Sequence, residues 1–354
     1  MKILVMAGGT GGHVFPALAV AEVLRAKGHE IVWMGAADSF EARVIPGQSI
    51  PIEFIRVQGL RGKGLARWLK APLVLIRSVA DALGILRRLR PAVVLGMGGF
   101  AAGPGGIAAW MMRRPLVIHE QNAAAGLTNR LLARLAKRVL EAFPGTFAGA
   151  ETVGNPVRRG FSDLPEPEHR IGQDGDPRRR LLVIGGSQGA RSLNTILPAA
   201  LALMAESERP QVHHQAGRTF DVAKAAYQSA GVDAQLAAFI ENMPEAYGWA
   251  DLVVCRAGAS TVAELAAAGC AALLVPFPAA VDDHQTKNAE YLVKAGAAVL
   301  VQERDLDAPR LASLLRELLG DTARLVSMAR AARTAAWPDA DEAIAQCCLE
   351  VAAC

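Results

Sequence analysis

Two short glycine-rich segments are the parts of this sequence best suited to binding a phosphate. The first, at residues 8–13, follows the apolar run 2–7, and the second, at residues 185–191, follows the apolar run 181–184. Glycines let the backbone approach a phosphate closely, and a helix that begins after them offers N–H donors. Either segment alone fits a mere tight turn, but the same unit in both halves of the chain indicates two nucleotide-type domains.

A third glycine cluster, at residues 96–104, follows the apolar run 92–95. Such a cluster is as typical of close helix packing as it is of a ligand-binding loop. Together with the first segment it predicts a second diphosphate site in the first half of the chain, formed by Gly9, Gly98 and Gly99.

Two common nucleotide-binding motifs do not fit these glycines. The dinucleotide fingerprint G-x-G-x-x-G needs a small residue where Val14 stands, and no acidic residue closes the strand predicted at residues 30–34. The Walker pattern with its Gly-Lys-Ser/Thr is absent from the sequence. These departures disfavour a nicotinamide-dependent dehydrogenase and a P-loop phosphotransferase.

His13 is the leading candidate for a general base. It stands directly after the first glycine segment, at the start of a predicted helix, where it could meet a substrate hydroxyl. An unperturbed imidazole titrates near pH 6.5, about where a general base is most useful. A plain packing role at the helix start is the alternative. His119 and Glu120 form a second candidate pair, in which Glu120 would supply or assist the base.

Short apolar runs alternate with helix-length segments along the chain, which is typical of a parallel sheet with helices on both faces. The strands predicted in the first half are 2–7, 30–34, 92–96, 116–119 and 138–142, and those in the second half are 181–184, 211–215, 235–239, 252–255, 272–275 and 298–301. The sequence therefore predicts an α/β protein with two doubly wound, Rossmann-like domains whose sheets face a cleft.

The composition changes in the middle of the chain, at residues 162–180, which are rich in proline and acidic residues. We interpret this segment as a linker or exposed loop. This change of composition predicts a first domain at residues 1–160 and a second domain at residues 161–336. Residues 337–354 are predicted to form a last helix that packs back on the first domain.

The overall composition excludes several classes of protein. A chain of 354 residues that is 52% hydrophobic is too apolar for disorder and long enough for two cores. The five cysteines show no metal-ligand spacing, which favours a reducing compartment. No signal peptide precedes the first glycines, and the most apolar stretch, residues 91–112, contains six glycines and two prolines. We therefore expect a cytoplasmic protein without a transmembrane helix.

Positive charge is concentrated in the first half of the chain. The formal net charge is +4, but residues 56–114 contain eleven Lys and Arg against the single acid Asp81. The predicted helix at residues 72–90 is apolar almost all round, so it is either buried or in contact with lipid. Contact with lipid would make an anionic membrane surface the partner, bound through Trp68, Leu69, Leu73, Leu75 and Trp110.

Five motifs occur in a fixed order over nearly the whole chain. They are GGTGGHVFP at residues 8–16, HEQN at 119–122, GNPVR at 154–158, GGSQGA at 185–190 and DHQTKNA at 283–289. With this set the sequence resembles the MurG family of peptidoglycan N-acetylglucosaminyltransferases, glycosyltransferase family 28. The resemblance implies the GT-B fold and inverting transfer of GlcNAc from UDP-GlcNAc to the C4 hydroxyl of undecaprenyl-diphosphate-MurNAc-pentapeptide, which converts lipid I to lipid II. It also implies a peripheral position on the cytoplasmic face of the cell (inner) membrane.

The resemblance assigns residues to UDP-GlcNAc. Glu264 would accept hydrogen bonds from the ribose hydroxyls, Ile240 would bind uracil through its main chain, and Asn122 with Gln285 would contact GlcNAc. The full set is Thr10, Gly11, Gly12, Asn122, Arg158, Ser187, Ile240, Ala259, Ser260, Thr261, Val262, Ala263, Glu264 and Gln285. Phe100 departs from the family, since many relatives carry tyrosine there, so a catalytic hydroxyl at this position is in doubt.

We expect no cofactor and no metal. The only Asp-x-Asp near the middle of the chain, residues 174–176, falls in the predicted linker, so helix N-termini would hold the leaving diphosphate. The expected partners are UDP-GlcNAc, lipid I and the anionic membrane surface, with no nucleic acid. The resemblance also allows other cell-wall synthesis proteins as partners. A UDP-GlcNAc 2-epimerase, another glycolipid glycosyltransferase and a non-catalytic UDP-sugar sensor are the alternatives.

Overall fold

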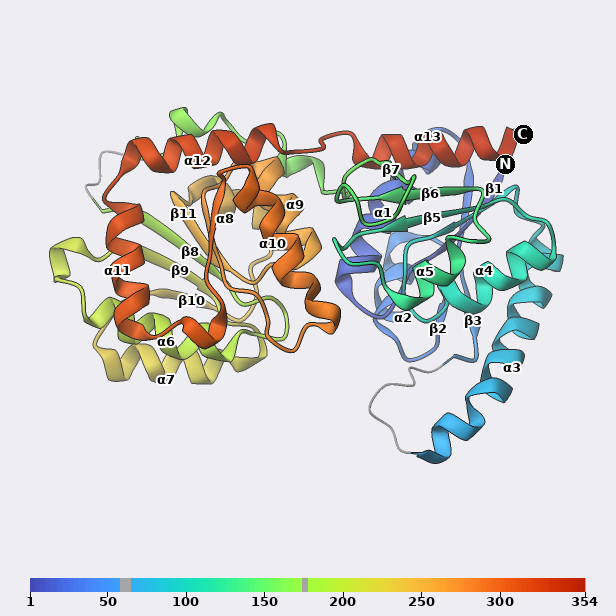
Figure 1. Cartoon of the computed structure of the whole chain (residues 1–354), viewed down its shortest axis with the longest axis horizontal. Coiled ribbons are helices and arrows are strands. Elements are labelled where there is room, and N and C mark those ends of the chain that lie inside the picture. The colour runs from blue at the N-terminus through green and yellow to red at the C-terminus, as the bar shows by residue number, and fades with distance from the viewer. Residues whose placement is uncertain (58–64, 174–177, 354) are drawn as a thin grey trace. The chain divides into compact units, whose positions relative to one another are not determined.

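The computed structural model of the chain describes residues 1–57, 65–173 and 178–353, with the backbone alone for residues 65–71, 159 and 281. Contacts within the chain divide it into two compact units (Figure 1). The first unit comprises Met1–Val157 and Asp339–Cys354, and the second comprises Arg158–Pro338. Each unit is described by itself below.

The first unit is built on one parallel sheet. Its strands are β1 Lys2–Met6, β2 Glu30–Ala36, β3 Ile52–Ile55, β4 Val93–Gly96, β5 Leu116–Glu120, β6 Arg138–Glu141 and β7 Glu151–Thr152. Within the described part of the chain their order across the sheet is β3-β2-β1-β4-β5-β6-β7, and each neighbouring pair is parallel. The strand order therefore reverses between β1 and β4, which makes this pair the switch point of the sheet.

Helices cover both faces of this sheet. They are α1 Gly11–Ala26, α2 Phe40–Val44, α3 Leu65–Leu89, α4 Ala102–Met111, α5 Leu127–Leu132 and α13 Ala340–Ala353. Ile3 and Val5 of β1 pack in one buried cluster with α1 and α13, whereas Leu4 and Met6 pack in another with α3 and α4. Alternate residues of a strand point to opposite faces of the sheet. When both faces are covered, the sequence of each strand is therefore a continuous apolar run.

The second unit repeats this plan. Its strands are β8 Arg180–Ile184, β9 Gln211–Gln215, β10 Gln235–Ala237, β11 Leu252–Cys255, β12 Ala272–Leu274 and β13 Ala298–Leu300. Its helices are α6 Arg191–Ala202, α7 Phe220–Ala230, α8 Met243–Trp249, α9 Ala259–Ala268, α10 His284–Lys294, α11 Ala308–Leu319 and α12 Thr322–Thr334. The strand order among the described residues is β10-β9-β8-β11-β12-β13, and it reverses between β8 and β11.

The sequence predicted the inner strands of both sheets but missed β3 and β7, the two edge strands of the first. In β3 only Ile55 is fully buried, and β7 is two residues long. An edge strand has one neighbour and buries less apolar surface, so its sequence pattern is weaker than that of an inner strand.

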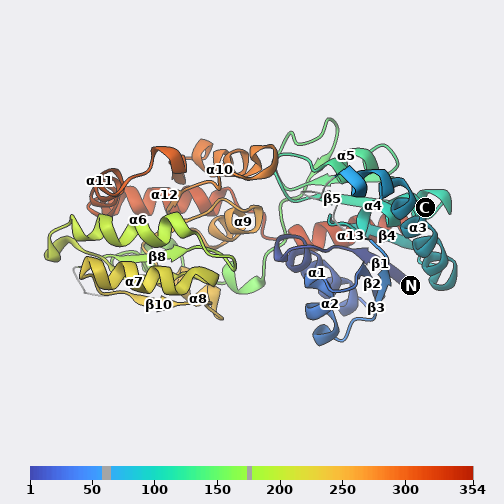
Figure 2. The same ribbon diagram turned by 90° about the horizontal axis from the view of Figure 1, so that it is seen from below.

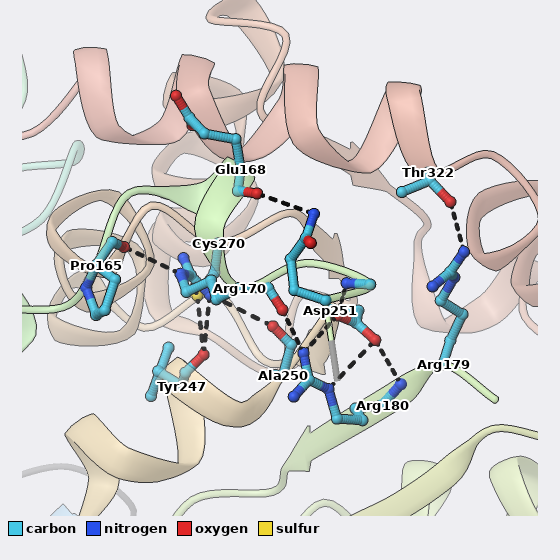
Figure 3. A network of polar contacts seen from close by, with 12 residues as sticks. Pro165, Glu168, Arg170, Arg179, Arg180, Tyr247, Ala250, Asp251, Cys270 and Thr322 are labelled. Carbon is cyan, nitrogen blue, oxygen red and sulfur yellow. Dashed lines mark hydrogen bonds and ion pairs between the residues drawn. The ribbon is translucent and has the colours of Figure 1, made fainter. Parts of the chain in front are cut away.

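Part of the segment 162–180, predicted as a linker or exposed loop, is built into the second unit, and that prediction is wrong for it. Arg170 is 8% exposed and donates to the carbonyl oxygens of Ala268 and Gly269 at the C-terminal end of α9. It also donates to two carbonyl oxygens at the end of α8 (Figure 3). A guanidinium carries five donors, so one buried arginine satisfies several backbone carbonyls. Composition alone does not distinguish this arginine from a solvated one.

Asp251 ties the same segment to the sheet (Figure 3). Its carboxylate accepts from the N–H of Gly172 at 3.1 Å, and from the N–H and guanidinium of Arg180 at 2.8 and 3.0 Å. Arg180 in turn donates to the carbonyl oxygen of Arg170 at 2.5 Å. Because Arg180 begins β8, this network joins the start of the sheet to the residues that close α8 and α9.

We expect Arg170→Met to lower the free energy of unfolding of the second unit by about 2–4 kcal/mol, because buried carbonyls lose their donors. Urea unfolding followed by circular dichroism measures the change. Arg330→Met is the matched control: its exposed guanidinium pairs with Glu168 at the surface, and its loss should cost less than about 1 kcal/mol. Equal losses in the two variants would contradict the structural role of Arg170.

Candidate functional site

In the first unit, the loops that carry the candidate residues follow three adjacent strands. Strands β1, β4 and β5 are parallel neighbours, so the loops after them lie at one edge of the sheet. These loops hold the first glycine segment, the third glycine cluster and the stretch that contains Asn122. The edge includes the switch point between β1 and β4, where ligands bind in doubly wound sheets.

The first and third glycine segments touch backbone to backbone. Gly99 has a φ of +88°, and a Cβ atom at this position would lie 2.5 Å from the carbonyl oxygen of Gly8. Any side chain there would separate the two loops, so the position requires glycine. The structure thus places Gly98 and Gly99 beside the first segment, while their binding of a diphosphate stays a prediction.

Glu41 of α2 holds the first glycine segment. Its side chain is 2% exposed and accepts from the N–H of Gly9 at 2.9 Å and from the N–H of Ala36 at 3.1 Å. The N–H of Gly9 therefore already has an acceptor within the unit, while the part of Gly9 in a diphosphate site stays a prediction. Gly11 and Gly12 open α1, where the N–H groups of the first turn have no acceptor inside the helix.

His13 lies in the first turn of α1, after the N-cap residue Thr10, and is half-buried. Its Nδ1 atom lies 3.1 Å from the Oε1 atom of Gln121, which is 1% exposed. A Cβ atom on Gly98 would lie 2.7 Å from the same Nδ1 atom. Residues from the loops after β4 and β5 thus surround the candidate base.

His119 and Glu120, the second candidate pair, are both buried and hydrogen-bonded. His119 has its Nε2 atom 2.8 Å from the carbonyl oxygen of Gly154, and burial lowers the pKa of this histidine to about 4. Glu120 accepts from the N–H and side-chain amide of Asn122 and from the N–H of Gly126. Glu120 therefore holds the loop that carries Asn122, and its part as a base stays a prediction.

In the second unit the corresponding loops follow β8, β11 and β12, which are also neighbours. The loop after β8 carries the exposed Ser187, and Gln285 lies in the first turn of α10, after β12. Helix α9 begins just after β11, at the switch point of this sheet. Its first six residues are Ala259, Ser260, Thr261, Val262, Ala263 and Glu264.

The start of α9 can bind an anion. The N–H groups of a first helical turn have no acceptor within the helix, and the helix dipole places partial positive charge there. The side-chain oxygen of Ser260 is buried and has no hydrogen-bond partner among the residues described. A buried hydroxyl without a partner costs free energy, so Ser260 favours a polar ligand at this helix end.

Glu264 is positioned by α8. The hydroxyl of the fully buried Tyr247 donates to a carboxylate oxygen of Glu264 at 3.2 Å. Burial raises the pKa of Glu264 to about 7, against the opposing effects of Arg158 and of the hydrogen bond from Tyr247. The exposed Arg158 lies with its guanidinium 5.6 Å from the ring centre of Phe161. The structure therefore brings Arg158 into electrostatic range of Glu264.

Gln285 and Ile240 lie at the same edge of the second sheet. The Oε1 atom of Gln285 accepts from the N–H of Ala257 at 3.2 Å and from the N–H of Phe277 at 2.9 Å, so this side chain joins the loops after β11 and β12. Ile240 follows β10 and is 7% exposed.

Arg256 fixes the same two loops and was not among the predicted site residues. Its guanidinium donates to the carbonyl oxygens of Val275 and Pro276, both at 3.1 Å, and pairs with Glu303. It also lies 5.5 Å from the ring centre of Phe277. A basic residue after a strand carries no signal of the carbonyls that it will meet, so Arg256 could not be found from the sequence.

Family models match both units of the chain. Residues 3–141 match the N-terminal domain of glycosyltransferase family 28, and residues 180–344 match its C-terminal domain. The chain belongs to glycosyltransferase family 28. The resemblance stated from the sequence motifs is confirmed.

Curated relatives of this family 28 chain match it from end to end. A protein of Alkalilimnicola ehrlichii is 58% identical over 99% of both chains, and one of Marinobacter nauticus is 56% identical over 99% of this chain and 98% of its own. Both are named UDP-N-acetylglucosamine--N-acetylmuramyl-(pentapeptide) pyrophosphoryl-undecaprenol N-acetylglucosamine transferase.

Solved structures agree with this assignment. MurG of Acinetobacter baumannii is 40% identical, with a TM-score of 0.87 over 99% of both chains. The calicheamicin glycosyltransferase CalG4 is 18% identical with a TM-score of 0.67 over 98% of both chains, a likeness that concerns the fold alone. The predicted fold class, two doubly wound α/β domains of the GT-B type, is confirmed.

The family 28 chain exposes apolar side chains on α3 and α4, two helices that pack against each other (Figure 2). Leu73 is 51% exposed, Leu75 46% and Trp110 55%. The side chains of Trp68 and Leu69, predicted to join them, lie outside the described residues. Phe100, the departure from the family pattern, is also exposed. Within the described ranges no helix is both long and apolar enough to cross a bilayer.

Proposed function

We propose that this chain transfers N-acetylglucosamine from UDP-GlcNAc to the C4 hydroxyl of undecaprenyl-diphosphate-MurNAc-pentapeptide, with inversion at the anomeric carbon. The observation that carries the proposal is 58% identity over the full length to a relative named for this transfer. The two loop edges described above support it, since each sheet has a switch point and ligands of doubly wound sheets bind there.

The second unit would bind the donor. The N–H groups of the first turn of α9, with the hydroxyl of Ser260, suit the diphosphate, and Glu264 suits the two ribose hydroxyls. Ile240 would bind uracil through its main chain, and Arg158, Ser187 and Gln285 would complete the contacts. As UDP leaves, negative charge develops on its diphosphate. Hydrogen-bond donors already in place would stabilise this charge, and such preorganised donors usually contribute most to transition-state stabilisation.

The first unit would bind the acceptor and take up its proton. The acceptor oxygen forms a bond to C1 of GlcNAc while the bond from C1 to the β-phosphate oxygen breaks, and the electron pair leaves with UDP. Attack from the face opposite UDP inverts the configuration. His13 would accept the hydroxyl proton. Gly98 and Gly99 would face the acceptor diphosphate, and Asn122 with residues 10–12 would contact the donor sugar.

Transfer of radiolabelled GlcNAc to a lipid I analogue, with EDTA present, tests the function. We expect wild-type transfer to survive EDTA, His13→Ala to lower kcat at least about 100-fold, and Glu264→Ala to raise the KM for UDP-GlcNAc about 10- to 100-fold. The matched controls are His29→Ala and Glu290→Ala. His29 directly precedes β2, away from the loops that follow the strands, and Glu290 is exposed on α10. Binding of UDP-GlcNAc without any transfer by the wild type would sink the acceptor assignment.

Donor binding should depend on pH through Glu264. Its raised pKa, about 7, means that the carboxylate is half protonated near neutral pH, so affinity for UDP-GlcNAc should rise as the pH rises through 7. Tyr247, Arg158 and Cys255 are titratable groups in electrostatic range of Glu264. The hydrogen bond from Tyr247 lowers this pKa, so Tyr247→Phe should move the midpoint to higher pH.

Calorimetric titrations with UDP-GlcNAc from pH 5.5 to 9 measure that midpoint. UDP-GlcNAc is the appropriate ligand because its diphosphate diester does not titrate in this range. Tyr227→Phe is the matched control, since the hydroxyl of this buried tyrosine contacts His214 and not Glu264. A shared midpoint for wild type and Tyr247→Phe would contradict the assignment of the pH dependence to Glu264.

We also propose that the first unit attaches peripherally to the cytoplasmic face of an anionic membrane through α3 and α4. One exposed leucine that enters the bilayer contributes about 2 kcal/mol, and each nearby basic side chain adds about 1 kcal/mol. Arg77 and Arg113 are exposed on or next to these helices. Together these contributions support reversible attachment.

Sedimentation with vesicles tests the attachment. Leu75→Glu should weaken binding to vesicles that contain anionic lipid at least about tenfold, and wild-type binding should weaken with added salt. Leu203→Glu is the control, because Leu203 is similarly exposed but belongs to the second unit. Equal losses for the two variants would rule out α3 as the membrane-binding surface.

A further inference from the structure

A chain of two hydrogen bonds runs from the end of β4 to the ring of His13. The side-chain Nε2 atom of Gln121 donates to the carbonyl oxygen of Met97 at 2.8 Å, and its Oε1 atom lies 3.1 Å from Nδ1 of His13. Met97 follows β4 directly, and its own N–H donates to the carbonyl oxygen of Met6 at the end of β1. These hydrogen bonds therefore connect His13 to β4 and β1, the two strands of the switch point.

The chemistry of these groups fixes the direction of both bonds. A backbone carbonyl only accepts, so the amide nitrogen of Gln121 must face Met97, and its oxygen must face His13. An amide oxygen also only accepts, so Nδ1 of His13 must carry a hydrogen. A neutral imidazole has one N–H, which leaves its Nε2 atom as the unprotonated nitrogen.

We infer that Gln121 is a positioning residue that holds His13 in the Nδ1–H tautomer, with Nε2 presented as the proton acceptor. A second observation supports this placement of the ring. Gly98 has a φ of +94°, and a Cβ atom there would lie 2.7 Å from Nδ1 and 2.8 Å from Cε1 of His13. The ring therefore packs against a backbone position that is clear only for glycine.

The surroundings of His13 leave the tautomer to Gln121. His119 is a titratable group in electrostatic range of His13, and burial lowers the pKa of His119 to about 4, so it is neutral at pH 7. Gln121 is 1% exposed, so water does not compete for its amide. The inference rests on the proposed function for its kinetic consequence, whereas the tautomer itself can be measured without turnover.

The first arm of the test is NMR on the full chain with 15N-labelled histidine, in which His13→Ala identifies the His13 resonances. We expect a protonated Nδ1 and a bare Nε2 in the wild type at a pH where the ring is neutral. Gln121→Glu loses the bond to the carbonyl oxygen of Met97 but should keep this tautomer, because a carboxylate also accepts from Nδ1, whereas Gln121→Met should release it to a mixture. A bare Nδ1 in the wild type, or an unchanged tautomer in Gln121→Met, would overturn the inference.

The second arm is kinetic. We expect Gln121→Met to lower kcat about 10- to 100-fold with less than a threefold change in the KM for UDP-GlcNAc, and to have no further effect in a His13→Ala background. Gln121→Glu should move the acid limb of the kcat profile to higher pH, because a carboxylate favours the protonated imidazole. Gln48→Met, at an exposed position in the same unit, is the control for the substitution itself.

The two arms separate the possible failures. An equal loss of kcat from Gln121→Met with and without His13 marks a merely structural role and overturns the inference. Retention of full kcat by Gln121→Met, despite a changed tautomer, overturns it as well, since Gln121 would then orient a ring that catalysis does not use. Absence of wild-type transfer defeats the proposed function alone, because the NMR arm still decides the tautomer.

Discussion

Direct backbone contact between two glycine loops is the constraint on which the candidate site of the first unit depends. The close approach of Gly99 to Gly8 is available to glycine alone and joins the loop after β1 to the loop after β4. Because α1 begins in the first of these loops, the contact also sets where His13 stands relative to Gly98. Gln121, in the loop after β5, contacts both this imidazole and the carbonyl oxygen of Met97 in the loop after β4.

Buried carboxylates stabilise the loops at this edge in a common way. Glu41 accepts from the N–H of Gly9, Glu120 from the N–H of Gly126, and Glu141 from the N–H of Gly145 at 2.8 Å. Each is about 2% exposed. A buried carboxylate is costly unless donors surround it, so each one enforces the loop conformation that brings the backbone N–H groups together. The loops are in this sense rigid supports for the residues between them.

Helix α9 is the corresponding element of the second unit, and it is held at its C-terminal end and in its middle. Arg170 and Arg333 donate to the carbonyl oxygens of its last residues, where positive charge complements the helix dipole. In the middle of the helix, the hydroxyl of Tyr247 donates to Glu264. A helix is stiff along its axis, so interactions that fix its C-terminal end also fix the donors at its N-terminal end. The segment that supplies Arg170 is thereby connected to the candidate donor site.

The sequence by itself determined the fold class, the inner strands and the loops that carry chemistry, because apolar periodicity and glycine-rich turns are local properties of the chain. Its ordered motifs also determined the family. The edge strands β3 and β7, the buried Arg170 and the supports Glu41, Tyr247 and Gln121 were decided by the tertiary structure alone. Their partners are far away in sequence: Glu41 meets Gly9, and Gln121 meets His13. Such contacts follow from sheet order and strand register, which bring the carboxyl ends of distant strands to one edge, and no local pattern records which side chains will meet there.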